Sequence, residues 1–204
     1  MMVTIYGSPK SSSGRCFWSL EEAGVAYEAK SIDFRAGEHK SEAFLKINPN
    51  GKVPALTDGD FVIWESLAIN NYVADAYKPE LLGTSAQQRG LVSQWSIWSV
   101  ADLQVPMIDA FIQLVFVPEE RRDAEVIKKA FEKLPALLNT LETGLEGKEY
   151  LVGDTFTLAD LNTAFVVGIC DDIKFDLAAY GNINNWRTRI AEREGTQRYK
   201  ALCK

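Results

Sequence analysis

The first part of the chain alternates short apolar runs with helical patterns. The apolar run Val3–Tyr6 predicts a strand, and the helical pattern of Arg15–Ala23 ends at Gly24, a residue type common just past a helix. Tyr27–Ile32 predicts a second strand. Because a helix joins these two strands, we expect a right-handed crossover that makes them parallel.

The residues that follow predict a short helix, a hairpin and a longer helix. Ser41–Lys46 has the pattern of the short helix, and Asp58-Gly59-Asp60 separates the apolar runs Val53–Thr57 and Phe61–Trp64. An Asp-Gly turn between such runs is a strong hairpin signal, so this pair of strands is antiparallel. Apolar residues at helical spacing continue after Glu65. The order β-α-β-α-β-β-α predicts a thioredoxin-like α/β domain with a mixed four-stranded sheet.

Beyond this domain the sequence predicts helices only. Lys78–Ala86, which contains Pro79 and Gly83, has the composition of a linker. Gln87–Val117 predicts one long helix with a kink at Pro106. We therefore expect residues 1–79 to form the α/β domain and residues 86–204 to form an all-α, helical domain.

Two more helices are expected in the second domain. Glu119–Leu145 predicts the first of them, with Pro118 as its first or capping residue. Thr157-Leu158-Ala159-Asp160 resembles a capping box with Asp in place of the usual Glu or Gln. This start predicts a helix that runs to about Cys170.

Composition and charge narrow the classes of function. Of the 204 residues, 47% are apolar and 25% are charged, an ordinary composition for a soluble globular protein. The net charge of −6 argues against sequence-independent binding to nucleic acid and against binding to anionic membranes. The most apolar long stretch, Val100–Val117, is interrupted by Asp102 and Asp109, so we expect no run that approaches the length of a membrane span.

The N-terminus and the cysteines indicate the reducing cytosol. Met1 to Tyr6 lack the basic and apolar regions of a signal peptide and predict a strand instead. Cys16, Cys170 and Cys203 are odd in number and widely spaced, which does not suggest a disulfide framework. We therefore expect a cytoplasmic protein.

The most informative segment is Asn48–Leu56, with the pair Glu65-Ser66 downstream of it. Pro54 has no N–H, and the N–H and C=O of Val53 are free at the strand end to bind a ligand. A cis Val53–Pro54 peptide, a form found in tight turns, turns these groups outward. Glu65 and Ser66 stand where a helix begins, and they offer acceptor oxygens and unpaired N–H groups. Together these features predict a socket for a short zwitterionic peptide.

These motifs resemble those of the glutathione S-transferase family. The resemblance rests on the Asn-Pro-x-Gly-x-Val-Pro-Ala-Leu segment, the Glu65-Ser66 pair and the Thr157 cap, and it covers essentially the whole chain. Gly7-Ser8-Pro9-Lys10-Ser11 and Gly37-Glu38-His39-Lys40 look most like the serine-dependent phi class. The resemblance implies an enzyme that takes glutathione as co-substrate, needs no other cofactor and joins glutathione to a hydrophobic electrophile. It also implies a homodimer.

Glutathione reacts only once its thiol is ionised, and an ordinary thiol titrates at about 8.5. A serine hydroxyl at the start of a helix stabilises the thiolate by a hydrogen bond, and the helix dipole adds positive potential. Ser11, Ser12 and Ser13 all precede the helix that starts at Arg15. The family pattern, with a serine two residues after Pro9, selects Ser11 as the catalytic residue. Helix capping is the plainer interpretation of the cluster, and Ser12 and Ser13 stay as alternatives, one of them as the cap.

The resemblance also assigns glutathione-binding roles. The backbone of Val53 pairs with the cysteinyl unit as an added strand does. Ser66 and its N–H form an anion site for the γ-glutamyl end, and Glu65 holds the adjacent ammonium group. The expected partners of the glycyl carboxylate are His39, Lys40 and Lys52. The alternatives are that Glu65-Ser66 only caps a helix and that the three basic side chains are solvated surface.

Other chemistries have little support in the sequence. A single histidine and cysteines without C-x-x-C spacing make a metal site improbable. Cys16 is expected to be a small, half-buried helix residue; a reactive thiol there would instead indicate a thiol transferase. Two other functions stay open: a non-catalytic transferase-like interaction module, and a glutathione-dependent isomerase, dehalogenase or peroxidase.

The electrophile site is left unassigned. The residues considered for it are Tyr6, Trp95, Trp98, Met107, Phe111 and Phe116. Aromatic and Met residues at helical spacing more often form a core or a dimer contact. Asp102 is interpreted as a solvated or capping acid.

Overall fold

The computed structural model describes residues 2–204, which form two compact units. The first unit runs from residue 2 to Leu82 and also includes Ala191–Lys204, and the second is Gly83–Ile190. The division expected from the sequence, 1–79 and 86–204, put all C-terminal residues into the helical domain. The structure differs because a C-terminal helix packs against the first helix of the chain.

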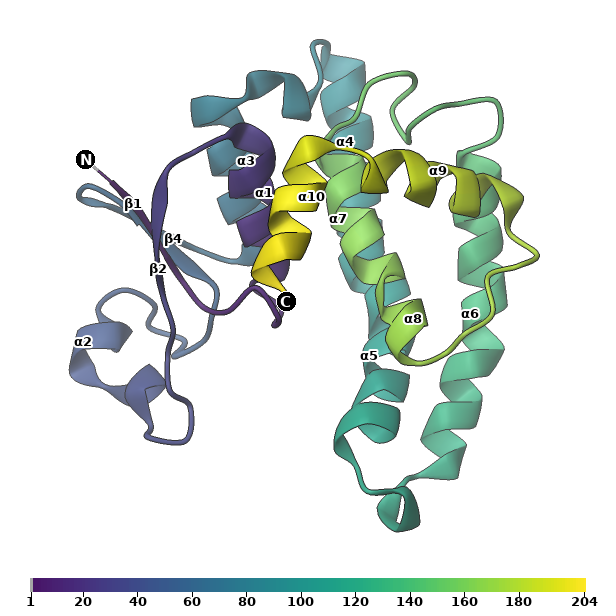
Figure 1. Cartoon of the computed structure of the whole chain (residues 1–204), viewed down its shortest axis with the longest axis horizontal. Coiled ribbons are helices and arrows are strands. Elements are labelled where there is room, and N and C mark those ends of the chain that lie inside the picture. Colours follow the sequence, from purple (N-terminus) through teal and green to yellow (C-terminus); the bar gives the residue numbers. More distant parts are fainter. Residues whose placement is uncertain (1) are drawn as a thin grey trace. The chain divides into compact units, whose positions relative to one another are not determined.

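The first unit is built around a four-stranded sheet (Figure 1). β1 and β2 are parallel, and β3 is antiparallel to both β1 and β4. The predicted mixed sheet is therefore confirmed, with β2 ending at Lys30 instead of Ile32. In the spatial order β2-β1-β3-β4, the strands are β2 (Tyr27–Lys30), β1 (Val3–Tyr6), β3 (Ala55–Asp58) and β4 (Phe61–Trp64).

Helices pack against this sheet and against each other. α1 and α3 are neighbours, and their apolar faces form a buried core with the sheet. α10 lies along α1 (Figure 1), and no pattern in the sequence predicted it. The helices of the unit are α1 (Gly14–Ala23), α2 (Glu42–Leu45), α3 (Ser66–Tyr77) and α10 (Glu194–Leu202), with 3-10 turns at Glu38–Lys40 and Pro79–Leu82. The core residues include Ile5, Phe17, Leu20, Leu56, Ile69 and Val73.

The second unit begins with the long helix predicted from its apolar spacing. It comprises α4 (Ala86–Trp98), α5 (Gln104–Phe111) and π-helical segments at Ser99–Leu103 and Ile112–Phe116. Pro106 lies within α5, and the widened π-helical segment comes directly before that helix. Proline has no N–H to give to the carbonyl four residues earlier, so an irregularity on its N-terminal side is expected.

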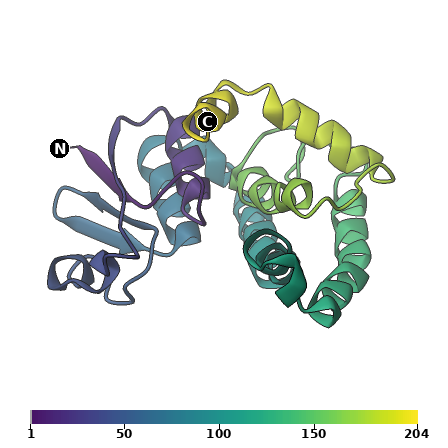
Figure 2. The same ribbon diagram turned by 60° about the horizontal axis from the view of Figure 1, so that its bottom comes forward.

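The remaining helices of this unit gather into one bundle with the long helix (Figure 2). α6 spans Ala124–Gly144, so the predicted start at Glu119 is wrong. Asp123 sets the observed start, because its side chain accepts from the N–H groups of Glu125 and Val126. α7 (Leu158–Val167) begins at the predicted capping box of Thr157 and Asp160, and α8 (Ile169–Asp172) and α9 (Gly181–Ala191) follow it.

One expectation about the long helix was wrong. Ala86–Phe116 has 31 residues and an apolar window of mean hydropathy 1.3, which meets the length and composition of a membrane span. Asp102 and Asp109 do not lower the average enough to prevent this. A single helix of this kind also occurs in soluble proteins, so it does not by itself assign the protein to a membrane.

Candidate functional site

One edge of the sheet brings the predicted site segments together. Tyr6 of β1 pairs with Ala55 of β3, and Ala55 pairs with Trp64 of β4. The residues just beyond these pairs are therefore neighbours in space. They are Gly7 after β1, Val53–Pro54 before β3 and Glu65 after β4.

Val53 presents free backbone groups at this edge. The Val53–Pro54 peptide is cis, the form considered for this turn from the sequence. Within residues 2–204, neither the N–H nor the C=O of Val53 makes a hydrogen bond. Val53 is half-buried and Pro54 is buried. The strand thus ends on a donor and an acceptor that a bound peptide can pair with.

The start of α3 lies beside Val53 and has an unusual backbone. Glu65 precedes the helix with φ 74° and ψ 120°, a conformation that costs a residue with a side chain about 1–3 kcal/mol. Its carboxylate makes no capping bond to the amides of α3 among the described residues, and it is exposed. Ser66 is the first helical residue and is half-buried. The first N–H groups of α3 therefore stay available for an anion.

Ser11 lies in the turn between β1 and α1, and its hydroxyl is part of a short chain of hydrogen bonds. The N–H of Ser13 donates to Ser11 Oγ over 3.1 Å, and Ser11 Oγ donates to the carbonyl oxygen of Ser8 over 2.8 Å. An oxygen that accepts one hydrogen bond becomes a stronger donor in the next. The side chain is half-buried, so its proton can turn from Ser8 toward a bound thiolate.

The other two serines of the cluster differ in access. Ser13 is fully buried, and it holds the N-cap position of α1 without a side-chain capping bond in the described chain. A Cβ on Gly7 would lie 2.2 Å from Ser13 Oγ, so this enclosure depends on the glycine. Ser12 is exposed. Burial removes Ser13 from the candidates for contact with a ligand, and it leaves Ser11 and Ser12.

Cys16 is more buried than the sequence predicted. It has no exposed surface, and burial raises the pKa of its thiol to about 12, against the smaller opposing effect of the Arg15 guanidinium. Its Sγ donates to the carbonyl oxygen of Ser66 over 3.6 Å. The thiol therefore stays protonated at neutral pH, which argues against the thiol-transferase interpretation.

The three basic candidates lie on two loops in contact. His39 and Lys40 belong to the 3-10 turn Glu38–Lys40, and Lys52 follows Gly51. A Cβ on Gly51 would lie 2.9 Å from the carbonyl oxygen of His39, so the two loops touch there. The side chains of Lys40 and Lys52 are exposed.

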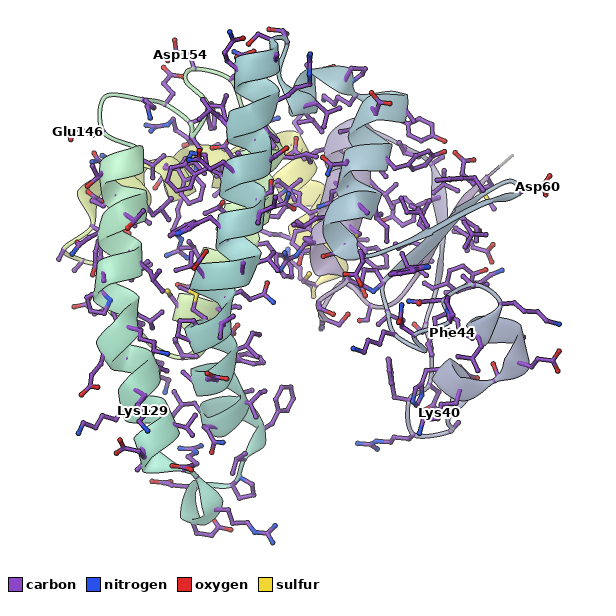
Figure 3. All side chains as sticks on the ribbon, turned by 180° about the vertical axis from the view of Figure 1, so that it is seen from behind. Lys40, Phe44, Asp60, Lys129, Glu146 and Asp154 are labelled. Atoms are coloured by element: carbon purple, nitrogen blue, oxygen red, sulfur yellow. The ribbon has the colours of Figure 1, made fainter. Side chains whose placement is uncertain are left out.

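The loop with Lys40 lies toward the same end of the sheet as Val53. Lys40 and Phe44 share one segment, far from Asp60 in the β3–β4 turn (Figure 3). Phe44 is buried, and its ring lies 6.0 Å from that of Tyr6 at the end of β1. The basic loop is thereby attached to the site edge of the sheet, although no hydrogen bond or ion pair joins its side chains to Glu65 or Ser66 in the described chain.

His39 carries an enclosed polar atom. Its ring stacks on that of Phe34 with centroids 4.7 Å apart. Nδ1 is shielded from solvent and, within the part of the chain that the structure describes, has no hydrogen-bond partner. Such atoms are uncommon in folded proteins, and they mark places where a ligand or a water completes the pairing.

Asn48 supports the site and was not singled out from the sequence as a functional residue. It is buried, and its Nδ2 donates to the carbonyl oxygen of Lys52 over 2.6 Å. Its Oδ1 accepts from the N–H of Asn50 over 3.0 Å. These bonds fix the loop before Val53. The Asn-Pro-Asn-Gly pattern, typical of a turn held by an Asn side chain, is the signal that could have identified it.

Two residues considered for an electrophile site are core residues of the second unit. Trp95 is 8% exposed and Met107 has no exposed surface. Phe111 and Phe116 form an edge-to-face pair, and Phe116 is 70% exposed. Among the described residues no group of His, Cys, Asp or Glu is arranged to hold a metal ion.

Known proteins match this arrangement over nearly the whole chain. The family model for the glutathione S-transferase N-terminal domain matches residues 1–75, and that for the C-terminal domain matches residues 105–194. Glutathione S-transferase F10 of Arabidopsis thaliana is 38% identical over 177 residues, 82% of either chain. Glutathione S-transferase 1 of Zea mays is 35% identical over 207 residues, 98% of this chain and 96% of the relative.

Solved structures agree with these matches. A glutathione S-transferase-I bound with lactoylglutathione superposes with a TM-score of 0.92 at 34% identity, covering 99% of this chain and 100% of that one. Glutathione transferase F2 from Populus trichocarpa superposes with a TM-score of 0.90 at 30% identity, covering 98% of each chain. The chain therefore belongs to the glutathione S-transferase family and is similar to its plant phi-class members, in agreement with its sheet and with the cis peptide before β3.

Proposed function

We propose that the protein is a glutathione transferase that holds glutathione at the site edge of the sheet and stabilises its thiolate with Ser11. Membership of the family supports the activity. The observation that carries the choice of residue is the Ser11 hydroxyl, which is accessible and accepts the Ser13 N–H over 3.1 Å. Of its neighbours, Ser13 is enclosed and Cys16 is a buried thiol.

Glutathione has three parts that this edge can hold. The cysteinyl backbone pairs with the free N–H and C=O of Val53, as a strand added to a sheet does. The γ-glutamyl carboxylate binds the N–H groups at the start of α3, at Ser66, and Glu65 holds the adjacent ammonium group. The glycyl carboxylate binds His39, Lys40 and Lys52. The shielded Nδ1 of His39 and the free groups of Val53 support this orientation.

The chemical step needs the thiolate. At pH 7 a thiol with a pKa of about 8.5 is only about 3% ionised, and a pKa lowered by two units makes it about three-quarters ionised. This shift corresponds to about 2.7 kcal/mol of preferential binding to the thiolate. The Ser11 hydroxyl contributes by donating a hydrogen bond, and the uncapped start of α1 contributes positive potential.

The second substrate is proposed to be a hydrophobic electrophile. A maize glutathione S-transferase I of known structure, 34% identical to this chain, holds an atrazine glutathione conjugate. We propose the same general class here, and a cytoplasmic homodimer as the working form. Apolar side chains exposed on the long helix, including Leu91, Ile97 and Val105, support an interface there.

The test is glutathione binding followed by conjugation. Wild-type protein should be retained on immobilised glutathione and should conjugate glutathione to an activated aryl chloride. Ser11→Ala should lower kcat/KM at neutral pH by about 100-fold, the usual effect of removing one donor to a developing anion. Ser12→Ala is the matched control, and it should stay near the wild-type rate because its side chain is exposed to solvent in the same turn.

Two results would overturn parts of this proposal. If Ser12→Ala lowers the rate and Ser11→Ala does not, Ser12 and not Ser11 is the residue that contacts the thiolate. Wild-type protein that neither binds glutathione nor turns over the aryl chloride would support the non-catalytic interaction module instead.

A further inference from the structure

The C-terminal helix α10 reaches the turn that carries Ser11. The Tyr199 hydroxyl donates to the carbonyl oxygen of Pro9 over 3.1 Å, and Cys203 Sγ lies 3.7 Å from the same oxygen. Lys10 Nζ donates to the backbone oxygen of Lys204 over 3.3 Å. α10 and the two residues that follow it therefore contact Pro9 and Lys10, which come directly before Ser11.

The ring of Tyr199 is held firmly enough to direct its hydroxyl. It stacks on the indole of Trp18 in α1, with centroids 5.5 Å apart and planes inclined by 6°. Trp18 is buried, and its Nε1 donates to Thr196 Oγ1 of α10 over 3.2 Å. The hydroxyl is thus fixed from two helices, while the carbonyl it binds belongs to the turn before Ser11.

An ion pair with a buried carboxylate and a half-buried guanidinium docks α10 on α1. Glu22 is buried and accepts from Arg193 through Nη2 over 2.8 Å and through Nε over 3.2 Å, the two-bond geometry of a strong pair. A Cβ on Gly195 would lie 2.5 Å from Glu22 Cδ, so only glycine allows this close approach. Arg198 adds a second pair with Glu21 over 3.1 Å. α10 is therefore a rigid support.

The position of the turn determines where the Ser11 hydroxyl lies. The carbonyl oxygen of Ser8 accepts from both the N–H and the Oγ of Ser11, and Pro9 follows directly with a ring that restricts the backbone. Fixing the next carbonyl, that of Pro9, leaves the turn little freedom to rotate. Loss of that anchor lets Ser11 Oγ move, and a small displacement at a reacting group is costly.

We propose that Tyr199 is a positioning residue for the reaction: through its hydrogen bond to Pro9 it holds the Ser8–Ser11 turn so that the Ser11 hydroxyl meets the glutathione thiolate. The inference rests on the proposed role of Ser11. Tyr199 does not touch the thiolate, and its effect passes through the backbone of the turn. α10 thereby becomes part of the active site's support, although it lies at the other end of the chain.

The test compares two Tyr→Phe variants in the full chain. Tyr199→Phe removes the bond to Pro9 and keeps the stack on Trp18. Tyr27→Phe is the control, because Tyr27 is also half-buried and also donates one hydroxyl bond, over 2.8 Å to Glu21, the residue that pairs with Arg198. The measurement is the pH profile of kcat/KM for aryl chloride conjugation, with KM for glutathione determined separately.

Tyr199→Phe should lower kcat/KM by about 3- to 10-fold at about pH 6.5, with the loss shrinking toward alkaline pH, where the thiol ionises unaided. KM for glutathione should change by less than about 2-fold, because the groups of Val53 and α3 are unaffected. Tyr27→Phe should keep the wild-type profile. In the Ser11→Ala background, Tyr199→Phe should cause no further loss, since both changes act on one hydrogen bond.

Three results would overturn the inference: a Tyr199→Phe profile equal to wild type, an equal loss in Tyr27→Phe, or losses that multiply with Ser11→Ala. The role of Ser11 is judged separately. A silent Ser11→Ala rejects the proposed donor whatever Tyr199→Phe does, whereas a shifted Ser11→Ala profile with a silent Tyr199→Phe rejects only the positioning role.

Discussion

The helix starts at the site edge of the sheet differ from three capped helix starts in the second unit. In the second unit, side chains cap α4, α6 and α7: Ser85 and Thr157 belong to complete capping boxes, and Asp123 accepts two amides. In the first unit, α1 and α3 begin at Ser13 and Glu65, neither of which makes a side-chain capping bond in the described chain. Both of these starts lie at the site edge of the sheet, whereas α2 of the same unit is capped by Ser41.

The capped helix starts contribute to the stability of the fold, and the uncapped starts at the site edge can bind an anion. A capped helix start has its N–H groups satisfied, which stabilises the fold by about 1 kcal/mol per cap. The start of α3 leaves its first N–H groups for an anion, and the start of α1, where the N–H groups of Gly14 and Cys16 bond to the carbonyl oxygens of Ser11 and Ser13, offers the positive end of the helix dipole. Glutathione offers a thiolate for α1 and a carboxylate for α3. We therefore expect changes at the capped starts to affect stability and changes at the uncapped starts to affect binding.

The largest effect is expected at the start of α7. Asp160 is fully buried and accepts from the N–H groups of Leu151 and Thr157 and from Trp186 Nε1, all within 2.9 Å. Asp160→Ala leaves these donors unpaired and should lower the free energy of unfolding by about 3–5 kcal/mol. Chemical denaturation of wild type and variant measures the change.

The control for this variant is Ser85→Ala at the half-buried cap of α4, which should cost only about 1 kcal/mol. Both variants, while folded, should bind glutathione with wild-type affinity. A loss of glutathione affinity in either folded variant would contradict the expectation that capped helix starts contribute to stability and not to binding.

The next effect is expected at the start of α3. Glu65→Gly relieves the backbone cost of φ 74° and should raise the free energy of unfolding by about 1 kcal/mol. It also removes the carboxylate, so glutathione affinity should fall by about 10-fold. Denaturation and calorimetric titration measure the two changes.

Glu65→Ala is the matched variant, because it removes the carboxylate but keeps a Cβ. It should lose affinity to the same extent without the gain in stability. Equal free energies of unfolding for the Gly and Ala variants would show that the backbone conformation of Glu65 does not destabilise the fold.

The smallest effect is expected at Cys16, which lies near the uncapped start of α1. A thiol at a helix start usually has a lowered pKa, but burial raises that of Cys16 to about 12. Its thiolate fraction at pH 8 is then about one in ten thousand. An aromatic disulfide reagent should modify the partly exposed Cys203 first and leave Cys16 unmodified in the native protein. Rapid modification of Cys16, mapped by mass spectrometry, would contradict this.

The sequence predicted the sheet, and with it which candidate segments lie at one edge, because these signals are local. The two apolar runs and the Asp-Gly turn between them determine the β3–β4 pairing, and that pairing alone places Val53 beside Glu65. The local pattern of Thr157 and Asp160 likewise predicted the start of α7. Asn-rich α9 and polar α10 carry weak apolar patterns, and they are held by distant partners such as Glu142 and Glu22.

The choice among the three serines could not come from local signals. Ser13 is enclosed because Gly7, directly after β1, has no side chain and leaves room for the Ser13 side chain. Ser11 is oriented by the amide of Ser13 and, as we infer, by Tyr199 from the far end of the sequence. Burial and support of this kind arise only when distant segments fold together.

The most direct measurement of the central claim is the pKa of glutathione's thiol when bound, followed by the ultraviolet absorbance of the thiolate as pH is varied. We predict a bound pKa well below the free value of about 8.5 in the wild-type protein, and a return toward that value in Ser11→Ala but not in Ser12→Ala. A Ser11→Ala variant that binds glutathione with the wild-type thiol pKa would contradict the claim that Ser11 stabilises the thiolate.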